Sequence, residues 1–173
     1  MTSHGHDRDV VRERTTTWED PMLTAAQLGR LTGMELLEAV RAGELPAPPI
    51  ASTLGFDIEL VEEGRVVFVL DPAEFHYNPI GSVHGGVMAT LLDSALGCAV
   101  HSTLPAGVGY TSLDLDVRFL RGITTRTGRV RCEGRVVHSG RRTALAEATI
   151  TDGDGKLLAT GSSSCLVFEV PQG

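Results

Sequence analysis

The chain has 173 residues, of which 42% are hydrophobic and 21% charged, so it is long enough to bury one ordinary hydrophobic core. Its formal net charge is −7, which excludes a typical nucleic-acid-binding protein, because such proteins carry an excess of basic residues. No apolar run reaches the length of a membrane span and the polar N-terminus lacks the apolar segment of a signal peptide, so we expect a cytoplasmic protein without a membrane partner.

The first part of the chain is predicted to be an extension of a single folded domain. Residues 1–23 are polar and show no hydrophobic period, which is typical of a flexible tail. The range 24–49 is predicted to form a short helical arm, since Thr32 and Glu35 have the spacing of a capping box. The arm is expected to end in a stiff linker at 46–49, where three of four residues are proline.

The range 50–170 is predicted to be one domain with several strands and one long apolar helix. Two strands precede the helix, which runs to about His101, and four strands follow it in a meander. The strands are expected at about 56–60, 66–70, 113–119, 128–138, 144–150 and 157–168. This order predicts an α+β fold with an antiparallel sheet of five to six strands and the helix buried against its concave face.

The predicted helix combines an apolar surface with an acidic residue and an open N-terminus. Asp93 lies in the middle of its apolar sequence, and a buried carboxylate is costly unless it has a partner or a function. Gly85 and Gly86 begin the helix, where the first N–H groups lack intrahelical acceptors, so a ligand oxygen can approach them. The alternative is that the two glycines only form a tight turn.

The spacing of Asn78, His84, Gly85, Gly86 and Asp93 resembles the PaaI-like branch of the hotdog-fold acyl-CoA thioesterases, within the 4-hydroxybenzoyl-CoA thioesterase superfamily. The resemblance extends over about 50–168 and implies a hotdog fold, in which the sheet wraps around the helix. It also implies an acyl-CoA substrate and a homo-oligomer, a dimer at least and often a tetramer built as a dimer of dimers. No cofactor and no metal are expected.

The resemblance implies a role for each residue of the motif in thioester hydrolysis. Asp93 is expected to act as general base on water or as the nucleophile. The Gly85 N–H, with His84 nearby, is expected to stabilise the oxyanion, and Asn78 to hold the carbonyl or the water. Ser112 is expected to orient Asp93 or the water.

Local chemistry leaves alternatives for these residues. Asn78 precedes a proline and suits a turn, His84 suits a helix cap, and Asp93 suits a structural hydrogen bond to the sheet. Thr111 and Ser112 both have a hydroxyl at the position that the family uses, and the match of the following strand favours Ser112.

The distance along the helix predicts a site shared between two chains. Gly85 and Asp93 are eight residues apart, which corresponds to about 12 Å along a helix axis. A donor and a base must each lie within about 3 Å of the reacting atoms, so the two residues cannot serve one carbonyl from the same chain. If both are catalytic, they come from different subunits, as the resemblance also implies.

Basic residues gather in one region of this acidic chain. Eight of the 15 basic residues lie between Arg118 and Arg142, where Glu133 is the one acid, and this excess suits a small polyanion such as the phosphates of coenzyme A. The range 139–143 resembles the family segment that holds these phosphates, so Arg141 or Arg142 is predicted to bind them and Arg118 less directly. Other arginines are expected to cover the solvent face of a strand: Arg129, Arg131 and Arg135.

Gly86 and Thr111 are further predicted contacts to the substrate, whose acyl group the sequence leaves open among aryl-acetyl, aromatic and medium-chain groups. Two other functions remain open: a non-catalytic acyl-CoA sensor, and an acyl-CoA hydratase or dehydratase. The cysteines show no metal-binding spacing and are expected to be buried and free: Cys98, Cys132 and Cys165.

Overall fold

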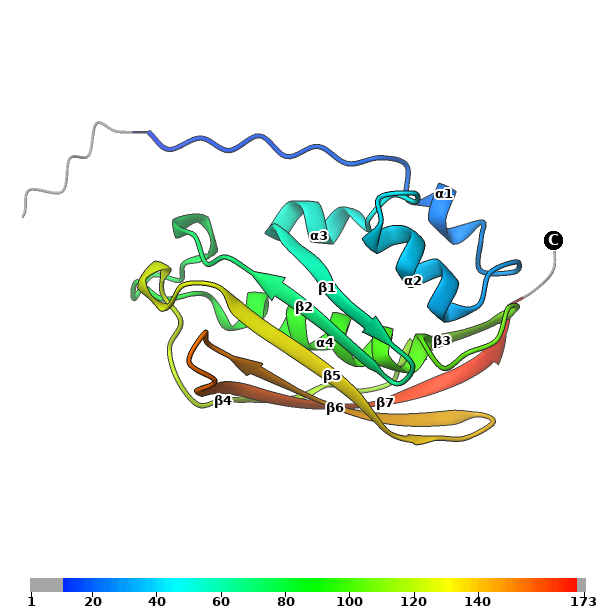
Figure 1. The fold of residues 1–173 in the computed structure, drawn as a ribbon. Coiled ribbons are helices and arrows are strands. Elements are labelled where there is room, and N and C mark those ends of the chain that lie inside the picture. The colour runs from blue at the N-terminus through cyan, green and yellow to red at the C-terminus, as the bar shows by residue number, and fades with distance from the viewer. Residues whose placement is uncertain (1–10, 171–173) are drawn as a thin grey trace, which may run out of the picture.

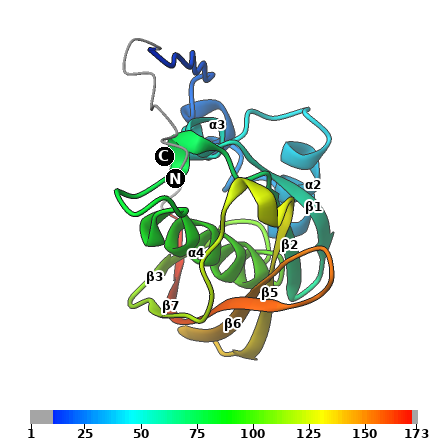
Figure 2. The ribbon, with the colours of Figure 1, turned by 90° about the vertical axis from the view of Figure 1, so that its left-hand side faces the viewer.

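In a computed structural model, which describes residues 11–170, the strands form one antiparallel sheet in the order β1-β2-β5-β6-β7-β3, with β4 also paired to β7 (Figure 1). The strands are β1 (Phe56–Glu62), β2 (Arg65–Leu70), β3 (Val108–Ser112), β4 (Asp116–Phe119), β5 (Val130–Ser139), β6 (Thr143–Thr151) and β7 (Leu157–Glu169). The sheet curves around helix α4 (Gly85–His101), as the end-on view in Figure 2 shows. This arrangement confirms the predicted α+β hotdog fold.

Helix α4 lies in the concave face of the sheet because its apolar residues cover most of its circumference. Leu92, Ala95 and Leu96 have no exposed surface, and the side chains of β5 and β6 that face them are equally buried. The small residues of β5 and β7 allow close packing, since a Cβ on Gly134 would lie 2.2 Å from the Ala95 carbonyl oxygen. The core therefore fixes α4 against the middle of the sheet.

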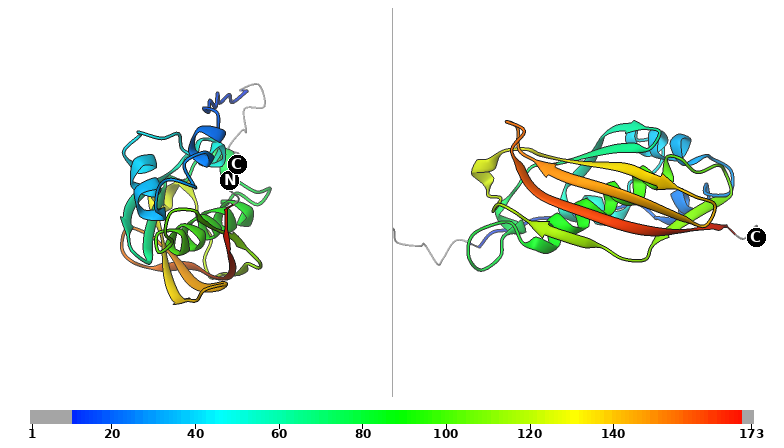
Figure 3. Two further views of the ribbon diagram at one scale, coloured as in Figure 1. Left: turned by 90° about the vertical axis from the view of Figure 1, so that its right-hand side faces the viewer. Right: turned by 90° about the horizontal axis from the view of Figure 1, so that it is seen from below.

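The strand prediction needs two corrections. The sheet has seven strands rather than five to six, because the predicted strand at 113–119 is replaced by two short strands, β3 and β4, that flank an interruption. The four later strands do not form one meander: β5, β6 and β7 do, whereas β3 and β4 pair with the far side of β7 (Figure 3). The interruption is stabilised at Asp114, whose carboxylate accepts the Ser164 N–H at 2.8 Å.

The N-terminal extension contains three short helices, α1 (Met22–Ala25), α2 (Gly33–Arg41) and α3 (Pro49–Leu54). The capping box that precedes α2 is confirmed, since the Thr32 hydroxyl accepts the Glu35 N–H and the Glu35 carboxylate accepts the Thr32 N–H. Helix α3 was not predicted. Its first residue is proline, which lacks an N–H but suits the first turn of a helix, and Gly55 in the left-handed conformation ends it.

The extension packs over the C-terminal half of α4. The Gly33 N–H donates to the Leu104 carbonyl at 3.0 Å, and a Cβ on Gly33 would lie 1.7 Å from the His101 carbonyl oxygen, so only glycine fits there. The predicted tail at 1–23 is described only from residue 11, and residues 1–10 lie outside the described range. Within 11–20, the Arg14 guanidinium donates to the carbonyls of Ser52 and Thr53.

The predictions for the cysteines and for the strand arginines are confirmed. Cys132 and Cys165 are buried and free, and Cys98 is free and partly buried. The three strand arginines form ion pairs on the outer surface: Arg129 with Asp71, Arg131 with Glu59, and Arg135 with Glu133. Over residues 11–170, no helix combines the length and the apolar character that a membrane crossing requires.

Candidate active site

The N-terminus of α4 has one open backbone donor and one that is capped. His84 is the N-cap, and its Nδ1 accepts the Gly86 N–H at 2.9 Å. The Gly85 N–H is at the first helical position, where no intrahelical acceptor exists. The helix end therefore offers the Gly85 N–H to an approaching oxygen, whereas the Gly86 N–H, a predicted substrate contact, is already engaged by His84.

The cap defines the tautomer of His84. Because Nδ1 accepts a hydrogen bond, the neutral ring carries its proton on Nε2. The His84 side chain is exposed, so the Nε2–H can donate to a ligand placed at the helix end. The two roles predicted for His84 are therefore compatible, because one ring nitrogen caps the helix and the other keeps an N–H that can donate to a ligand.

Asn78 organises the loop that leads into α4. Its side-chain oxygen accepts the N–H groups of Ile80 and Ser82, and its Nδ2 donates to the Ser82 hydroxyl at 3.0 Å. These contacts are those of a turn residue, and they leave one Nδ2–H for another acceptor. Asn78 and Gly85 line the same cavity of about 290 Å³, which Phe119 and Arg121 also border.

Asp93 faces the sheet and has a hydroxyl partner. The Ser112 hydroxyl donates to Asp93 Oδ1 at 2.9 Å, which joins the middle of α4 to the end of β3. The predicted pair is therefore adjacent, and of the two candidate hydroxyls Ser112 makes the contact while Thr111 lies next to it in the same strand. Asp93 is half-buried rather than fully enclosed by the apolar helix, so water reaches it.

The two groups of candidate residues lie at different places in the chain. Gly85 is beside Phe119 of β4, because a Cβ on Gly85 would lie 3.1 Å from that ring. Asp93 is beside Ser112 of β3, which is paired with Cys165 much further along β7. The structure brings Asn78, His84 and Gly85 together and Asp93 together with Ser112, but it leaves these two groups separate within one chain.

The arginines predicted to bind phosphate differ in whether they already have an acidic partner. Arg118 is paired with Asp116 at 2.7 Å. Arg141 and Arg142 lie in the turn between β5 and β6, exposed, and their side chains make no hydrogen bond or ion pair with any described residue. The register aligns Thr143, Leu166 and Thr111 across β6, β7 and β3, so this turn is at the Asp93–Ser112 end of the sheet.

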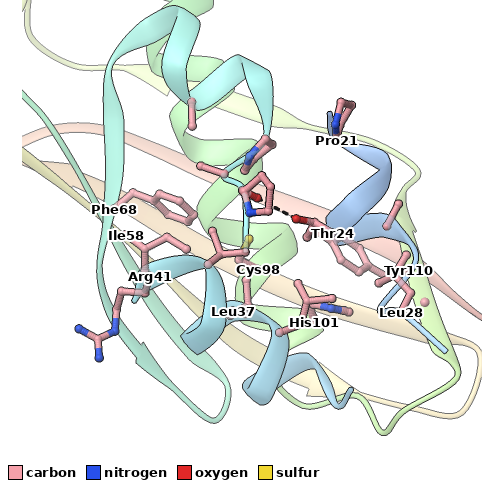
Figure 4. A pocket seen from close by; sticks show the side chains of 18 of the residues that line it. Pro21, Thr24, Leu28, Leu37, Arg41, Ile58, Phe68, Cys98, His101 and Tyr110 are labelled. Atoms are coloured by element: carbon pink, nitrogen blue, oxygen red, sulfur yellow. Dashed lines mark hydrogen bonds between the residues drawn. The ribbon is translucent and has the colours of Figure 1, made fainter. Parts of the chain in front are cut away.

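A larger cavity, which the sequence did not predict, lies between the N-terminal extension and the C-terminal half of α4 (Figure 4). Its volume is about 790 Å³, and its walls include Leu37 from α2, Cys98 and His101 from α4, and Tyr110 from β3. Burial raises the pKa of the Cys98 thiol to about 12 and lowers the pKa of His101. The one signal in the sequence was the apolar side of the 24–44 segment, which predicted packing on the domain or on a second copy.

Comparisons with known proteins identify the relatives of this chain. Residues 80–159 match the family model described as the thioesterase superfamily. The chain is similar to a 1,4-dihydroxy-2-naphthoyl-CoA hydrolase of Listeria monocytogenes, with 28% identity over 109 residues that cover 63% of this chain and 87% of the relative.

Two solved structures share the fold. A phenylacetic acid degradation-related protein from Ralstonia eutropha JMP134 is 30% identical and superposes with a TM-score of 0.69, over 75% of this chain and 98% of that one. The E. coli PaaI protein from the phenylacetic acid degradation operon is 23% identical with a TM-score of 0.69, over 82% of this chain and 99% of that one. The second likeness concerns the fold alone.

Proposed function

The chain is an enzyme of the thioesterase superfamily, and on that premise we propose that it hydrolyses an acyl-CoA thioester to the free acid and CoA. The observation that carries the proposal is the hydrogen bond from Ser112 to Asp93, since it holds a half-buried carboxylate of an apolar helix beside a residue that lines a cavity. A carboxylate held in this way suits attack on a carbonyl. The Listeria relative, named as a CoA thioester hydrolase, supports the substrate class.

The helix end supplies the charge stabilisation that the reaction needs. The carbonyl oxygen of the thioester would accept the Gly85 N–H, with the His84 Nε2–H as a second donor and the positive end of the α4 dipole behind them. The free Nδ2–H of Asn78 is available at the edge of the same cavity. These donors would bind the oxyanion more strongly than the neutral carbonyl, which lowers the barrier.

Asp93 would supply the base or the nucleophile. As a base, it takes a proton from water while the water oxygen bonds to the carbonyl carbon, and the C–S bond then breaks to release the CoA thiolate. As a nucleophile, its oxygen bonds to the same carbon, the thiolate leaves, and water hydrolyses the anhydride. In both routes the Ser112 hydroxyl holds the carboxylate in place, and the thiolate needs no strong acid to leave.

We propose that two copies of the chain complete each site. Gly85 and Asp93 are about 12 Å apart along α4, so one carbonyl cannot contact both within a chain. The edge of the sheet at β3 and β4 carries large exposed apolar side chains that a second copy would cover: Leu113, Leu115, Phe119 and Leu120. A symmetric dimer on this edge would contain two equivalent sites, and a tetramer would pair two such dimers.

The CoA phosphates would bind the turn between β5 and β6. Arg141 and Arg142 are exposed there and make no ion pair within the described range, whereas Arg118 is paired with Asp116. A guanidinium group offers two parallel N–H donors to a phosphate. Exchange of both arginines for glutamine should raise KM for acyl-CoA more than for the matching acyl-pantetheine thioester.

Purified mixed dimers of two inactive variants test the shared site. Asp93→Asn removes the base and Gly85→Pro removes one N–H at a position where proline suits a helix, so each homodimer should release little CoA thiol. A mixed dimer keeps both groups at one of its two sites, so it should show about half of the wild-type rate. Inactive mixed dimers would disprove the shared site, and a wild-type protein inactive on every thioester would disprove the hydrolase.

A further inference from the structure

The large cavity is built by the N-terminal extension and could not exist in a domain that began at β1. Helices α1 and α2 and the 46–48 segment form one side, and β1, β2, β3 and the C-terminal half of α4 form the other (Figure 4). Most side chains inside it are apolar, among them Leu36, Leu37, Phe56 and Phe68, which are all at least nine-tenths buried. We call this cavity the arm chamber.

We propose that the arm chamber binds the acyl group of the substrate, that this group is uncharged and bulky, and that helix α1 limits its length. This inference rests on the proposed thioester hydrolysis and deepens it. A cavity of about 790 Å³ is within the size range of sites for whole small ligands, and much larger than an acetyl group requires.

The arm chamber extends to the residue that holds Asp93 in place. Thr111 and Ser112 belong to its lining, and the Ser112 hydroxyl is the group that donates to Asp93 at 2.9 Å. A thioester whose carbonyl is attacked at Asp93 therefore has its acyl side next to the chamber mouth of the same chain. Its CoA side then extends outward, toward the solvent-exposed arginines at this end of the sheet.

The chemistry of the lining selects against a charged acyl group. The ionised residues of the lining, Arg41 and Asp57, are exposed at its margin, and Arg41 is paired with Glu38 at 2.8 Å. Deeper in the chamber, burial keeps His101 neutral by lowering its pKa and keeps the Tyr110 hydroxyl protonated by raising its pKa. A carboxylate placed there would lose its hydration without a cationic partner.

The arm is held in place by several hydrogen bonds, so the chamber has a defined end. The Leu28 carbonyl accepts the Gly107 N–H at 3.0 Å, and the Gly33 N–H donates to the Leu104 carbonyl. The Thr24 hydroxyl donates to the Pro46 carbonyl at 2.8 Å and closes the arm on itself. Because this wall is fixed, an acyl chain that is longer than the chamber would collide with it.

Two neighbouring alanines provide a matched test. Ala25 lines the chamber, whereas Ala26, the C-cap of the same helix, is exposed and does not line it. Both variants, Ala25→Phe and Ala26→Phe, should be assayed with saturated acyl-CoAs from acetyl to palmitoyl and with phenylacetyl-CoA. Binding of the matching S-alkyl-CoA thioethers, which cannot be hydrolysed, should be measured by calorimetry with the same proteins.

In the wild type, each added methylene should strengthen thioether binding by about fourfold until the chain reaches the end of the chamber. Ala25→Phe should move that limit to shorter chains and lower kcat/KM for long substrates by about tenfold or more, with acetyl-CoA unaffected. Ala26→Phe should reproduce the wild-type profile. If Ala25→Phe does not fold, Val40→Phe fills the chamber from α2 and should give the same shift.

Thiol release and thioether binding together distinguish a failure of the chamber as the acyl site from a failure of the proposed hydrolysis. Hydrolysis with a chain-length profile that Ala25→Phe and Val40→Phe both leave unchanged would overturn the arm chamber as the acyl site and leave the thioesterase standing. Thioether binding with the predicted shift but no thiol release would support the chamber and overturn the hydrolase. A free fatty acid that binds as tightly as the thioether would show a carboxylate site and would overturn the proposed selectivity for uncharged groups.

Discussion

The two ends of helix α4 differ in chemistry although one apolar sequence connects them. At the N-terminal end, Gly85 borders a small cavity, and the exposed His84 ring next to it offers a second N–H donor. In the C-terminal half, Cys98 and His101 line a larger apolar cavity under the N-terminal arm, and Asp93 accepts a hydrogen bond from Ser112, which also lines that cavity. The N–H donors at one end suit an oxyanion, and the apolar surface beside the other half suits an acyl chain. The polar and the apolar parts of one substrate would therefore contact different halves of the helix.

If Gly85 and Asp93 act on one carbonyl, as we propose, this separation means that one chain holds the parts of a site but not a complete one. The donors and the base are fixed to the same rigid helix, so no local movement of the chain can bring them together. A second copy, related by symmetry, can place its donor end against the base of the first. The predictions below test each end of α4 in turn.

The largest effect should come from the donor end. Gly85→Pro removes the N–H proposed for the oxyanion, and kcat should fall by about 100- to 1000-fold, which corresponds to the loss of one oxyanion donor. His84 already has the extended backbone that a following proline requires, so the helix should remain intact. The rate of CoA thiol release measures the loss.

Gly85→Ala is the matched control, because it adds a Cβ but keeps the N–H. That Cβ would lie 3.1 Å from the ring of Phe119, so the ring needs to shift by only a few tenths of an ångström. Its kcat should stay within about threefold of wild type, well short of the loss expected for a missing donor. An equal loss of activity in both variants would mean that steric contact at Gly85, and not its N–H, matters.

The second effect concerns the packing of the C-terminal half. Gly97 faces Tyr110, and a Cβ there would lie 2.4 Å from the Tyr110 hydroxyl oxygen, so Gly97→Ala should displace the ring. Overpacking of this kind typically costs about 1–3 kcal/mol of unfolding free energy. Urea unfolding should show it, and the double variant Gly97→Ala with Tyr110→Phe should recover part of the loss. No change in the unfolding midpoint would contradict the close packing.

The sequence was informative where local chemistry decides the structure. The capping box at Thr32, the extent of α4 and the alternation of β6 depend on neighbouring residues, and the structure confirms them. The interruption between β3 and β4 involves Asp114, whose carboxylate accepts the N–H of Ser164, about 50 residues away. The alternating pattern of 113–119 therefore predicted one continuous strand where the structure has a break. The spacing of hydrophobic residues along the chain carries no information on such distant contacts.

The candidate site likewise has one part that the local sequence predicts and one part that it does not. The Asn78-to-Asp93 spacing could be read directly, because a loop and a helix define it. The arm chamber could not be predicted, since it depends on how closely the arm approaches α4, and this approach is set by contacts such as that of Gly33 with His101. Residue types showed that the arm has an apolar side, but they left open whether this side covers its own domain or a second copy.

A smaller effect distinguishes the two hydroxyls of β3. Ser112→Ala should lower kcat by about tenfold, because it removes a hydrogen bond to a charged group that positions Asp93. Thr111→Ser, which keeps the hydroxyl and removes a methyl group from the chamber mouth, should leave kcat unchanged and affect only KM. Ser112→Thr should restore most of the rate. Thr111→Val, which removes the hydroxyl, should also keep the rate; a tenfold loss in Thr111→Val with none in Ser112→Ala would reverse the assignment.

The smallest effect compares a buried histidine at each end of α4. His76, whose carbonyl accepts the His84 N–H, and His101 both have pKa values lowered from 6.5, chiefly by burial. A lowered pKa means that the unfolded chain binds protons first as the pH falls, so the stability is complete above about pH 6.5 and decreases below it. Thermal unfolding between neutral pH and pH 5 should show this decrease, and His76→Gln and His101→Gln should each make the decrease smaller. Since His76 donates its Nε2–H to the Leu54 carbonyl and accepts the Ala73 N–H, whereas His101 Nδ1 has no described partner, His76→Gln should lower the midpoint at neutral pH more than His101→Gln does.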